Sequence, residues 1–188
     1  MTPLSSAGVT VGLPSGWEGE IYNRAPEDGG RSLTNTPADE EVARNVVHVA
    51  NFALPAERGD FGSGAVEIMN SGAILVVLFE HGPESVDTPL FARNGVPQLT
   101  VEEFDPQQMQ RTLMGQSGRQ IFFNEAGRAF CLYVVLGGHR QRSVLVPLVN
   151  EVLASLVIEP VEPVQPLEPE KSLEAEITVD DQFSKKEK

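Results

Sequence analysis

Three basic residues, His139, Arg140 and Arg142, lie close together in a chain that is otherwise acidic, with a formal net charge of -13. A guanidinium group presents its N–H donors in a planar fork that fits carboxylates and phosphates. A basic cluster that opposes the net charge therefore predicts a contact with an anion or a partner at this point. The alternative interpretation is a solvated loop in front of a helix, which keeps arginine out of the core.

Nucleophilic catalysis would need a serine or a cysteine in a recognisable setting. A serine hydrolase elbow reads Gly-x-Ser-x-Gly, whereas the segment 115–118 (GQSG) is followed by Arg119. The single cysteine, Cys131, excludes an internal disulfide framework and a site built from several thiolates. It alternates with apolar residues in an expected strand, which predicts an inert core thiol. We therefore expect no catalytic residue and no cofactor.

Oxygen and imidazole ligands crowd one further segment, in which Glu80, His81, Glu84 and Asp87 fall within eight positions. The segment contains Pro83 and has no helical pairing that would direct two ligands at one metal ion. We expect a solvated loop here and no metal site.

Glycines at 59, 62 and 64 precede a possible helical turn and could present backbone N–H groups to an anion. The loop lacks the Lys-Ser/Thr pair of a nucleotide-binding P-loop and the spacing of a dinucleotide fingerprint. The triplet Arg58-Gly59-Asp60 has the form of an adhesion tripeptide, but such triplets also arise by chance. A plain turn is the expected structure.

Charge divides the chain into two parts. Residues 1–158 hold 18 acidic and 10 basic side chains, all ten of them arginine, whereas residues 159–188 hold 9 acidic side chains and 4 lysines. From Pro160 the sequence is rich in Pro and Glu and lacks the apolar content needed to fold alone. We expect one folded domain over residues 1–160 and a disordered tail over 161–188.

The tail carries two sets of residues that recur every third position, which matches the three-residue turn of a polyproline II helix. An extended tail would present a proline edge and an apolar edge, so it could act as a contact arm or as a stiff spacer. The proline edge is Pro160, Pro163, Pro166 and Pro169, and the apolar edge is Val161, Val164 and Leu167.

Elements that could position these groups follow from hydrophobic periodicity. Alternation or apolar runs predict two short strands over 8–23 and further strands over 46–54 and 73–80. A hairpin is expected from strands 120–124 and 128–136 around residues 125–127, and Asp105-Pro106 is a typical helix start.

The C-terminal part of the domain shows one apolar stripe at helical spacing, beginning at Leu145 and ending at Leu156. Pro147 fits only in a first helical turn, so the helix should start between Arg142 and Pro147. A short strand at Val157-Ile158 should follow it. The expected core between sheet and helix contains Trp17, Phe130, Leu132, Leu148, Val152 and Leu156.

Strands outnumber helices, and the hairpins favour antiparallel pairing. We therefore expect an α+β domain with a mainly antiparallel sheet flanked by helices as an α/β/α sandwich. The connections 24–44 and 81–96 are long, polar and without predicted structure.

Two segments give the chain a resemblance to the PsbP/Mog-like family, which includes a protein of the oxygen-evolving complex and bacterial relatives. One is the strand 9–11 leading into the segment 13–17 (LPSGW), and the other is a strand followed by an amphipathic helix and the segment 154–158 (ASLVI). The resemblance implies an antiparallel sheet between helices that serves as a binding or assembly module. It supplies no catalytic residues.

The preferred hypothesis is thus a non-catalytic binding or assembly module with a protein partner. One alternative is an enzyme acting on a small anionic substrate near Arg140 and Arg142, and another is a carrier of a small apolar ligand. The acidic charge argues against nucleic acid. The printed sequence shows no spanning segment or leader, from which we expect no membrane insertion and a cytoplasmic location.

Overall fold

The computed structural model describes residues 1–24, 44–109 and 111–160, and the account below concerns those residues. The expected polar connection 24–44 and the tail 161–188 lie outside this part of the chain, apart from the end residues Arg24 and Arg44.

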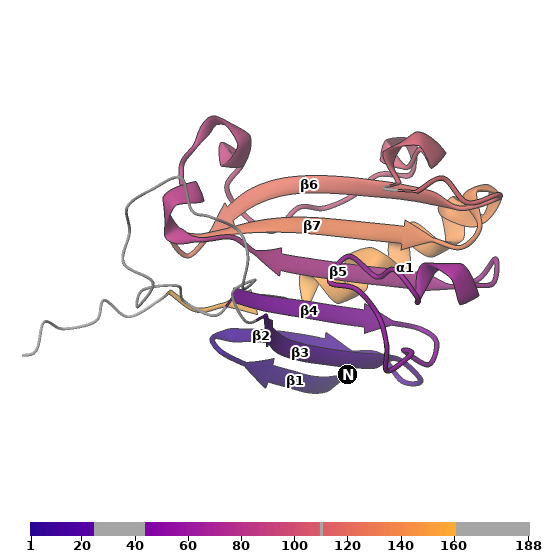
Figure 1. Ribbon diagram of the computed structural model, residues 1–188, viewed down its shortest axis with the longest axis horizontal. Coiled ribbons are helices and arrows are strands. Elements are labelled where there is room, and N and C mark those ends of the chain that lie inside the picture. The colour runs from indigo at the N-terminus through magenta and orange to yellow at the C-terminus, as the bar shows by residue number, and fades with distance from the viewer. Residues whose placement is uncertain (25–43, 110, 161–188) are drawn as a thin grey trace, which may run out of the picture.

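A five-stranded antiparallel sheet forms the centre of the domain (Figure 1). The fully apolar strands β5 and β7 lie inside it, as expected for strands that are covered on both faces. The strand order is β3 (Glu18–Arg24), β4 (Arg44–Ala50), β5 (Ile74–Glu80), β7 (Arg128–Leu136) and β6 (Ser117–Glu125).

A second, three-stranded antiparallel sheet closes one end of the molecule. Its order is β1 (Thr2–Ser6), β2 (Val9–Leu13) and β8 (Val157–Ile158). The sequence pattern did not predict β1, because this strand is largely exposed and carries no apolar alternation. It did predict a strand at Val157-Ile158, and the structure shows that this strand pairs with β2.

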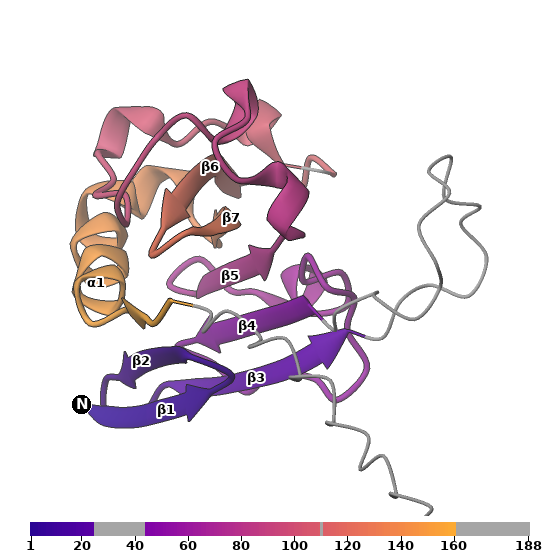
Figure 2. The same ribbon diagram turned by 90° about the vertical axis from the view of Figure 1, so that its left-hand side faces the viewer.

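Helix α1 (Arg142–Ala154) covers one face of the five-stranded sheet (Figure 2). Its apolar stripe packs against alternate residues of β4, β5 and β7, and Val149 and Val152 are fully buried in this first core cluster. The helix starts within the predicted interval. Pro147 falls in its second turn, where the carbonyl of Ser143 loses its usual intrahelical donor.

The opposite face is covered by loops and single 3-10 turns, and α1 is the only α-helix in the described ranges. The expected α/β/α sandwich is therefore corrected to an α+β fold with a helical layer on one face. A second cluster, which includes Phe79, Tyr133 and Val135, fills this side. The described ranges contain the turns η2 (Val66–Ile68), η3 (Pro83–Ser85), η4 (Pro89–Phe91), η5 (Val101–Glu103), η6 (Pro106–Gln108) and η7 (His139–Gln141). Of these, η5 lies on the helix side, where it contacts α1, and η7 leads directly into α1.

The predicted helix after Asp105-Pro106 is reduced to the single turn η6. Asp105 caps it as expected, since its Oδ1 accepts a hydrogen bond from Gln107 N at 2.8 Å. The turn ends because Met109 adopts an extended conformation and is buried in the second cluster. Burial of one apolar side chain thus outweighs a favourable helix start.

The predicted hairpin is confirmed and joins β6 to β7 through Ala126 and Gly127, with φ values of 52° and 72°. Two successive positive φ values are typical of a type I′ turn, which matches the twist of the paired strands. Its strands are longer than expected, because β6 already starts at Ser117.

The core prediction is correct for Phe130, Leu132 and Val152, which are buried. It holds in part for Trp17, Leu148 and Leu156, which pack against the first cluster but are only partly buried. Periodicity selects the apolar face of an element, but it does not show how far the neighbouring elements extend over that face.

Candidate functional site

The predicted basic cluster lies where η7 leads into α1. Arg142 Nη1 donates to the backbone carbonyl of His139 at 3.0 Å and lies 2.9 Å from His139 Nε2. Because a guanidinium group only donates, Nε2 must be the acceptor in this contact. Arg142 is thus half-buried against His139, whereas Arg140 is exposed to solvent. The structure brings two of the three predicted residues together and leaves the third outside that contact.

Arg140 and Arg142 differ from most arginines of the described ranges, because neither forms an ion pair within 4.0 Å with a carboxylate of these ranges. Arg93, on a different loop, shares this property and provides a control position. Six other arginines each pair with a carboxylate within that distance: Arg24, Arg44, Arg58, Arg111, Arg119 and Arg128. The start of α1 therefore carries positive charge that this part of the chain does not neutralise.

Two loops from other parts of the sequence lie beside this helix start. The carbonyl of Gly115 accepts a hydrogen bond from His139 N at 2.7 Å. Gln116 Nε2 donates to the carbonyl of Val66 at 2.8 Å, and Gln141 Nε2 donates to Ser71 Oγ at 3.4 Å. The segments 66–71, 113–116 and 137–142 therefore meet at the end of the sheet where β7 stops (Figure 1).

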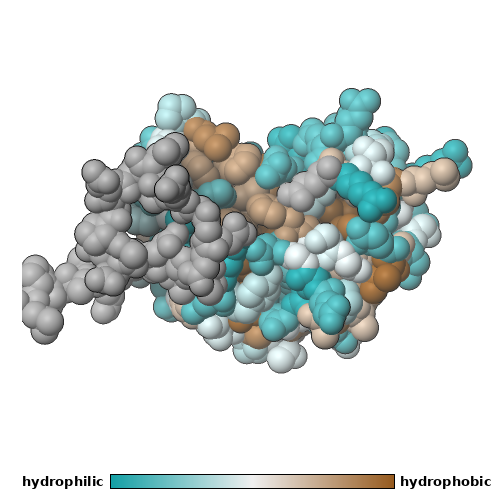
Figure 3. Space-filling view, viewed as in Figure 1, coloured by the Kyte–Doolittle hydropathy of each residue, from teal (hydrophilic) through white to brown (hydrophobic). Residues whose placement is uncertain are grey.

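Two of these segments each expose one large apolar side chain, and a third such side chain, Val144, follows the segment 137–142 in the first turn of α1. Ile68 is 59% exposed, Val144 is 65% exposed and Met114 is fully exposed. In the space-filling view, apolar residues reach the surface beside hydrophilic ones at the right-hand end of the molecule (Figure 3). We call Ile68, Met114, Arg140 and Val144 the α1-start surface. The sequence pattern indicated only Arg140, because Ile68 and Met114 come from distant segments and Val144 lies outside the apolar stripe of α1.

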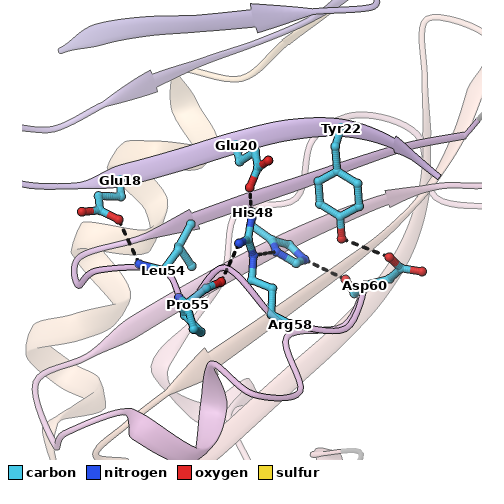
Figure 4. A network of polar contacts seen from close by, with 8 residues as sticks. All are labelled: Glu18, Glu20, Tyr22, His48, Leu54, Pro55, Arg58 and Asp60. Carbon is cyan, nitrogen blue, oxygen red and sulfur yellow. Dashed lines mark hydrogen bonds and ion pairs between the residues drawn. The ribbon is translucent and has the colours of Figure 1, made fainter.

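A network of polar contacts joins side chains of β3 and β4 to the loop 55–60 (Figure 4). Arg58 Nε donates to His48 Nδ1 at 2.6 Å, and His48 Nε2 donates to the backbone carbonyl of Asp60 at 2.8 Å. Arg58 also pairs with Glu20 and donates to the carbonyl of Pro55 at 2.7 Å. Both nitrogens of the imidazole ring are therefore occupied.

Burial lowers the pKa of His48, which favours the neutral ring that these contacts require. Tyr22 donates to Asp60 Oδ1 at 3.0 Å, and burial together with this hydrogen bond raises the pKa of Tyr22. His48 is fully buried, so a substrate cannot reach a lone pair or proton on it. The network fastens the loop 55–60 onto the edge of the sheet, which is a structural role.

The same contacts show that the glycine-rich loop 59–64 and the triplet 58–60 are held by partners within the fold. Arg58 is buried, and Asp60 Oδ2 lies 3.1 Å from Arg24 Nε, so neither end of the triplet is presented to a receptor. Gly59 N and Gly62 N donate to carbonyls of the loop, and Gly64 N donates to Glu67 Oε2 at 2.7 Å. These amides are thus not available as an anion-binding nest. The expected plain turn is confirmed.

The oxygen and imidazole groups near residue 80 point to different partners. Glu80 pairs with Arg128, Glu84 lies 3.7 Å from Arg44, and Asp87 accepts from Asn124. His81 packs among Phe79, Phe91 and Phe122, with ring centroids 5.0 to 6.1 Å away. No group of three or more candidate metal ligands occurs in the residues that the structure describes.

Cys131 is buried in β7, where Gln120 Nε2 lies 3.2 Å from its sulfur. Burial raises the pKa of its thiol to about 11, so the thiol stays protonated at neutral pH. Ser117 lies within β6 and is also fully buried. Neither side chain is placed as an accessible nucleophile.

Two hollows in the described domain lie away from the α1-start surface. One is an apolar cavity of about 20 Å³ between the sheet and α1, lined by residues such as Val76 and Leu153. The other is an open hollow of about 290 Å³ beside the β6–β7 turn, lined by residues such as Asp87 and Asn124. The first has room for about one water molecule, far below the usual size of a ligand pocket.

Comparison with known proteins gives a plain result. No protein-family model, no curated protein and no solved structure matches this chain. In addition, no helix within residues 1–24, 44–109 and 111–160 has the length and apolar character that a membrane span requires. A function for this chain must therefore be inferred from the geometry of the domain.

Proposed function

We propose that this domain is a non-catalytic binding module that docks an acidic peptide segment with apolar side chains on the α1-start surface. The observation that carries the proposal is that Ile68, Met114 and Val144 are exposed apolar side chains on segments that meet beside the exposed Arg140. Exposed apolar groups that lie beside unpaired charge are typical of protein-interaction sites.

The chemistry of the four residues defines the class of ligand. Apolar side chains of a partner would gain by burying area against Met114 and Val144, whereas a carboxylate of the partner would pair with the planar guanidinium of Arg140. A basic or uncharged ligand would gain only the free energy of the apolar contacts, without the ion pair to Arg140.

Two observations favour this module over the enzyme alternative. Within the described residues, shifted pKa values are found at His48, His81, Tyr22 and Cys131, which lie outside the α1-start surface. The two hollows described above also lie elsewhere. Catalytic sites usually combine a pocket with perturbed titratable groups. The 20 Å³ cavity gives no support to the apolar-ligand carrier.

The PsbP/Mog-like resemblance belongs to this proposal as well. It is supported by the antiparallel sheet, by the turn that joins β2 to β3 through the segment 13–17, and by α1 followed by β8 at the end of the domain. In that turn, Trp17 N donates to the carbonyl of Pro14 at 3.1 Å. The order of the five main strands and the position of α1 in an experimental PsbP/Mog-like structure provide the direct comparison.

Fluorescence anisotropy with the full-length protein tests the binding function. The probes are labelled ten-residue peptides in three sets: acidic with apolar residues, acidic without apolar residues, and basic with apolar residues. We expect saturable binding of the first set only. The double variant Arg140→Glu/Val144→Ser should bind at least tenfold more weakly, whereas the matched Arg93→Glu variant should bind like the wild type. Equal binding by all three proteins would contradict the proposal.

A further inference from the structure

We infer that the α1-start surface binds residues 159–170 of a second copy of this chain, so that copies associate head to tail. This inference rests on the proposed binding function and names its partner. Three observations carry it: the chemistry of the segment, the place where it leaves the domain, and the distance that keeps its first part away from the α1-start surface of its own chain.

The segment 159–170 combines the two properties that the α1-start surface requires. It contains four glutamates and no basic residue, and Val161, Val164 and Leu167 recur every third position. In a polyproline II helix such residues share one edge, with a spacing of about 9 Å. We call residues 159–170 the strip. A segment that is already extended loses little conformational entropy on binding.

The rest of the C-terminal sequence lacks this combination. Residues 171–188 hold five acidic side chains and four lysines, so their charges nearly cancel. Their apolar residues Leu173, Ile177 and Val179 do not keep a three-residue spacing. Charge and periodicity therefore both select the strip next to the domain.

The starting point of the strip is fixed by Arg128. Its Nη1 donates to the carbonyl of Glu159 and to the carbonyl of Gly8, each at 3.1 Å. Arg128 is the first residue of β7, whereas the α1-start surface lies just beyond Leu136, the last residue of that strand. Nine strand residues place the two points about 27 Å apart.

This separation keeps the first part of the strip away from the α1-start surface of its own chain. A fully extended chain gains about 3.5 Å per residue, so Val161 stays within about 7 Å of Glu159 and Val164 within about 18 Å. Both residues fall short of the surface on the same chain. A strip that places all three apolar residues on an α1-start surface must therefore use the surface of another copy.

The contact joins different surfaces of the two copies. Such a head-to-tail interface leaves one surface and one strip unoccupied in every open assembly, so further copies add until a ring closes or a filament grows. Because the paired charges are exposed, the association should weaken as the salt concentration rises.

Sedimentation velocity of the full-length chain over a wide concentration range tests the inference. We expect the wild type to associate with increasing concentration beyond the dimer. The strip variant Val161→Ser/Val164→Ser/Leu167→Ser and the surface variant Arg140→Glu/Val144→Ser should each remain monomeric. The matched controls Leu173→Ser/Ile177→Ser/Val179→Ser and Arg93→Glu should behave like the wild type.

Mixing the two monomeric variants provides the decisive measurement. The strip variant keeps an intact surface and the surface variant keeps an intact strip, so a mixture should form a complex of one copy of each and grow no further. Circular dichroism of each variant checks that it is folded. Formation of the mixed complex shows independently that the unchanged surface of one variant and the unchanged strip of the other can still bind.

Two outcomes would overturn the inference. If the wild type stays monomeric while the acidic, apolar peptides still bind, the binding function holds and self-association is wrong. If the chain associates but the strip variant associates equally well, another segment forms the contact. Failure of the peptide panel itself would instead reject the binding function.

Discussion

Arg128 and Glu80 form a two-pronged ion pair between neighbouring strands, with Arg128 Nε and Nη2 each 2.7 Å from a different carboxylate oxygen. The two side chains are only 4% and 14% exposed. Asn45 Nδ2 also donates to this carboxylate, and Arg128 bonds the carbonyls of Ala7, Gly8 and Glu159. One guanidinium thus holds the small sheet and the end of the domain against the large sheet.

The first prediction concerns this pair. Arg128→Ala should destabilise the fold by about 3–5 kcal/mol, because it leaves Glu80 buried without its counter-charge and several carbonyls without a donor. Urea unfolding measures the change, and the double variant with Glu80→Ala should lose less than the sum of the two single changes. Arg93→Ala, at an exposed arginine, should change stability by about 0.5 kcal/mol or less.

The second prediction concerns two leucines on the same helix. Leu153→Ala should cost about 2–5 kcal/mol, since Leu153 is buried against the sheet. Leu148→Ala should cost clearly less, because Leu148 is only partly buried at the edge of the cluster. Denaturant unfolding of both variants compares identical chemical changes, and an equal loss would show that the edge is packed as tightly as the centre.

The third prediction concerns pH. Burial lowers the folded-state pKa of His48 and of His81 below their ordinary value of 6.5. Below that pH the unfolded chain takes up protons that the folded state resists, so the stabilisation present above pH 6.5 is lost as the pH falls. Unfolding free energies at about pH 7.5 and 5.5 should therefore differ, and His48→Gln should reduce the difference. If the His48→Gln variant kept the full wild-type pH dependence of the unfolding free energy, His48 would be excluded as a source of that dependence.

The fourth prediction concerns Cys131. Its thiol should react with a disulfide reagent such as Ellman's reagent only when the domain opens, because it is buried and its pKa is raised to about 11. The labelling rate in native buffer should therefore be far below that of a free thiol and should rise with urea. Rapid labelling of the native protein would mean that the second core cluster is accessible.

The fifth prediction concerns the end of the domain. Deletion of residues 161–188 should leave the thermal midpoint nearly unchanged, as the Pro/Glu-rich sequence indicates. Ending the chain at Leu156 should lower the midpoint by several degrees, because it removes β8 and the carbonyl of Glu159 that Arg128 binds. Differential scanning calorimetry of the two truncated proteins compares them with the full chain.

Local sequence patterns determined most of the elements of this protein. Alternation and apolar runs predicted the strands around residues 73–80 and 128–136, and the stripe from Leu145 predicted α1. The turn at Ala126-Gly127 followed from residue types, since these signals act between residues that are close in sequence. The basic residues at the start of α1 were also visible, because their charge contrasts with the rest of the chain.

Only the tertiary structure decided how these elements combine. The pairing of β8 with β2, the role of Arg128 and the neighbours of Arg140 depend on contacts between residues that are far apart in sequence. The helix expected after Asp105 gave way to a single turn because Met109 was drawn into a core that other segments form. Ile68, Met114 and Val144 share no period, so a common surface arises only when packing brings their three segments to the same end of the sheet.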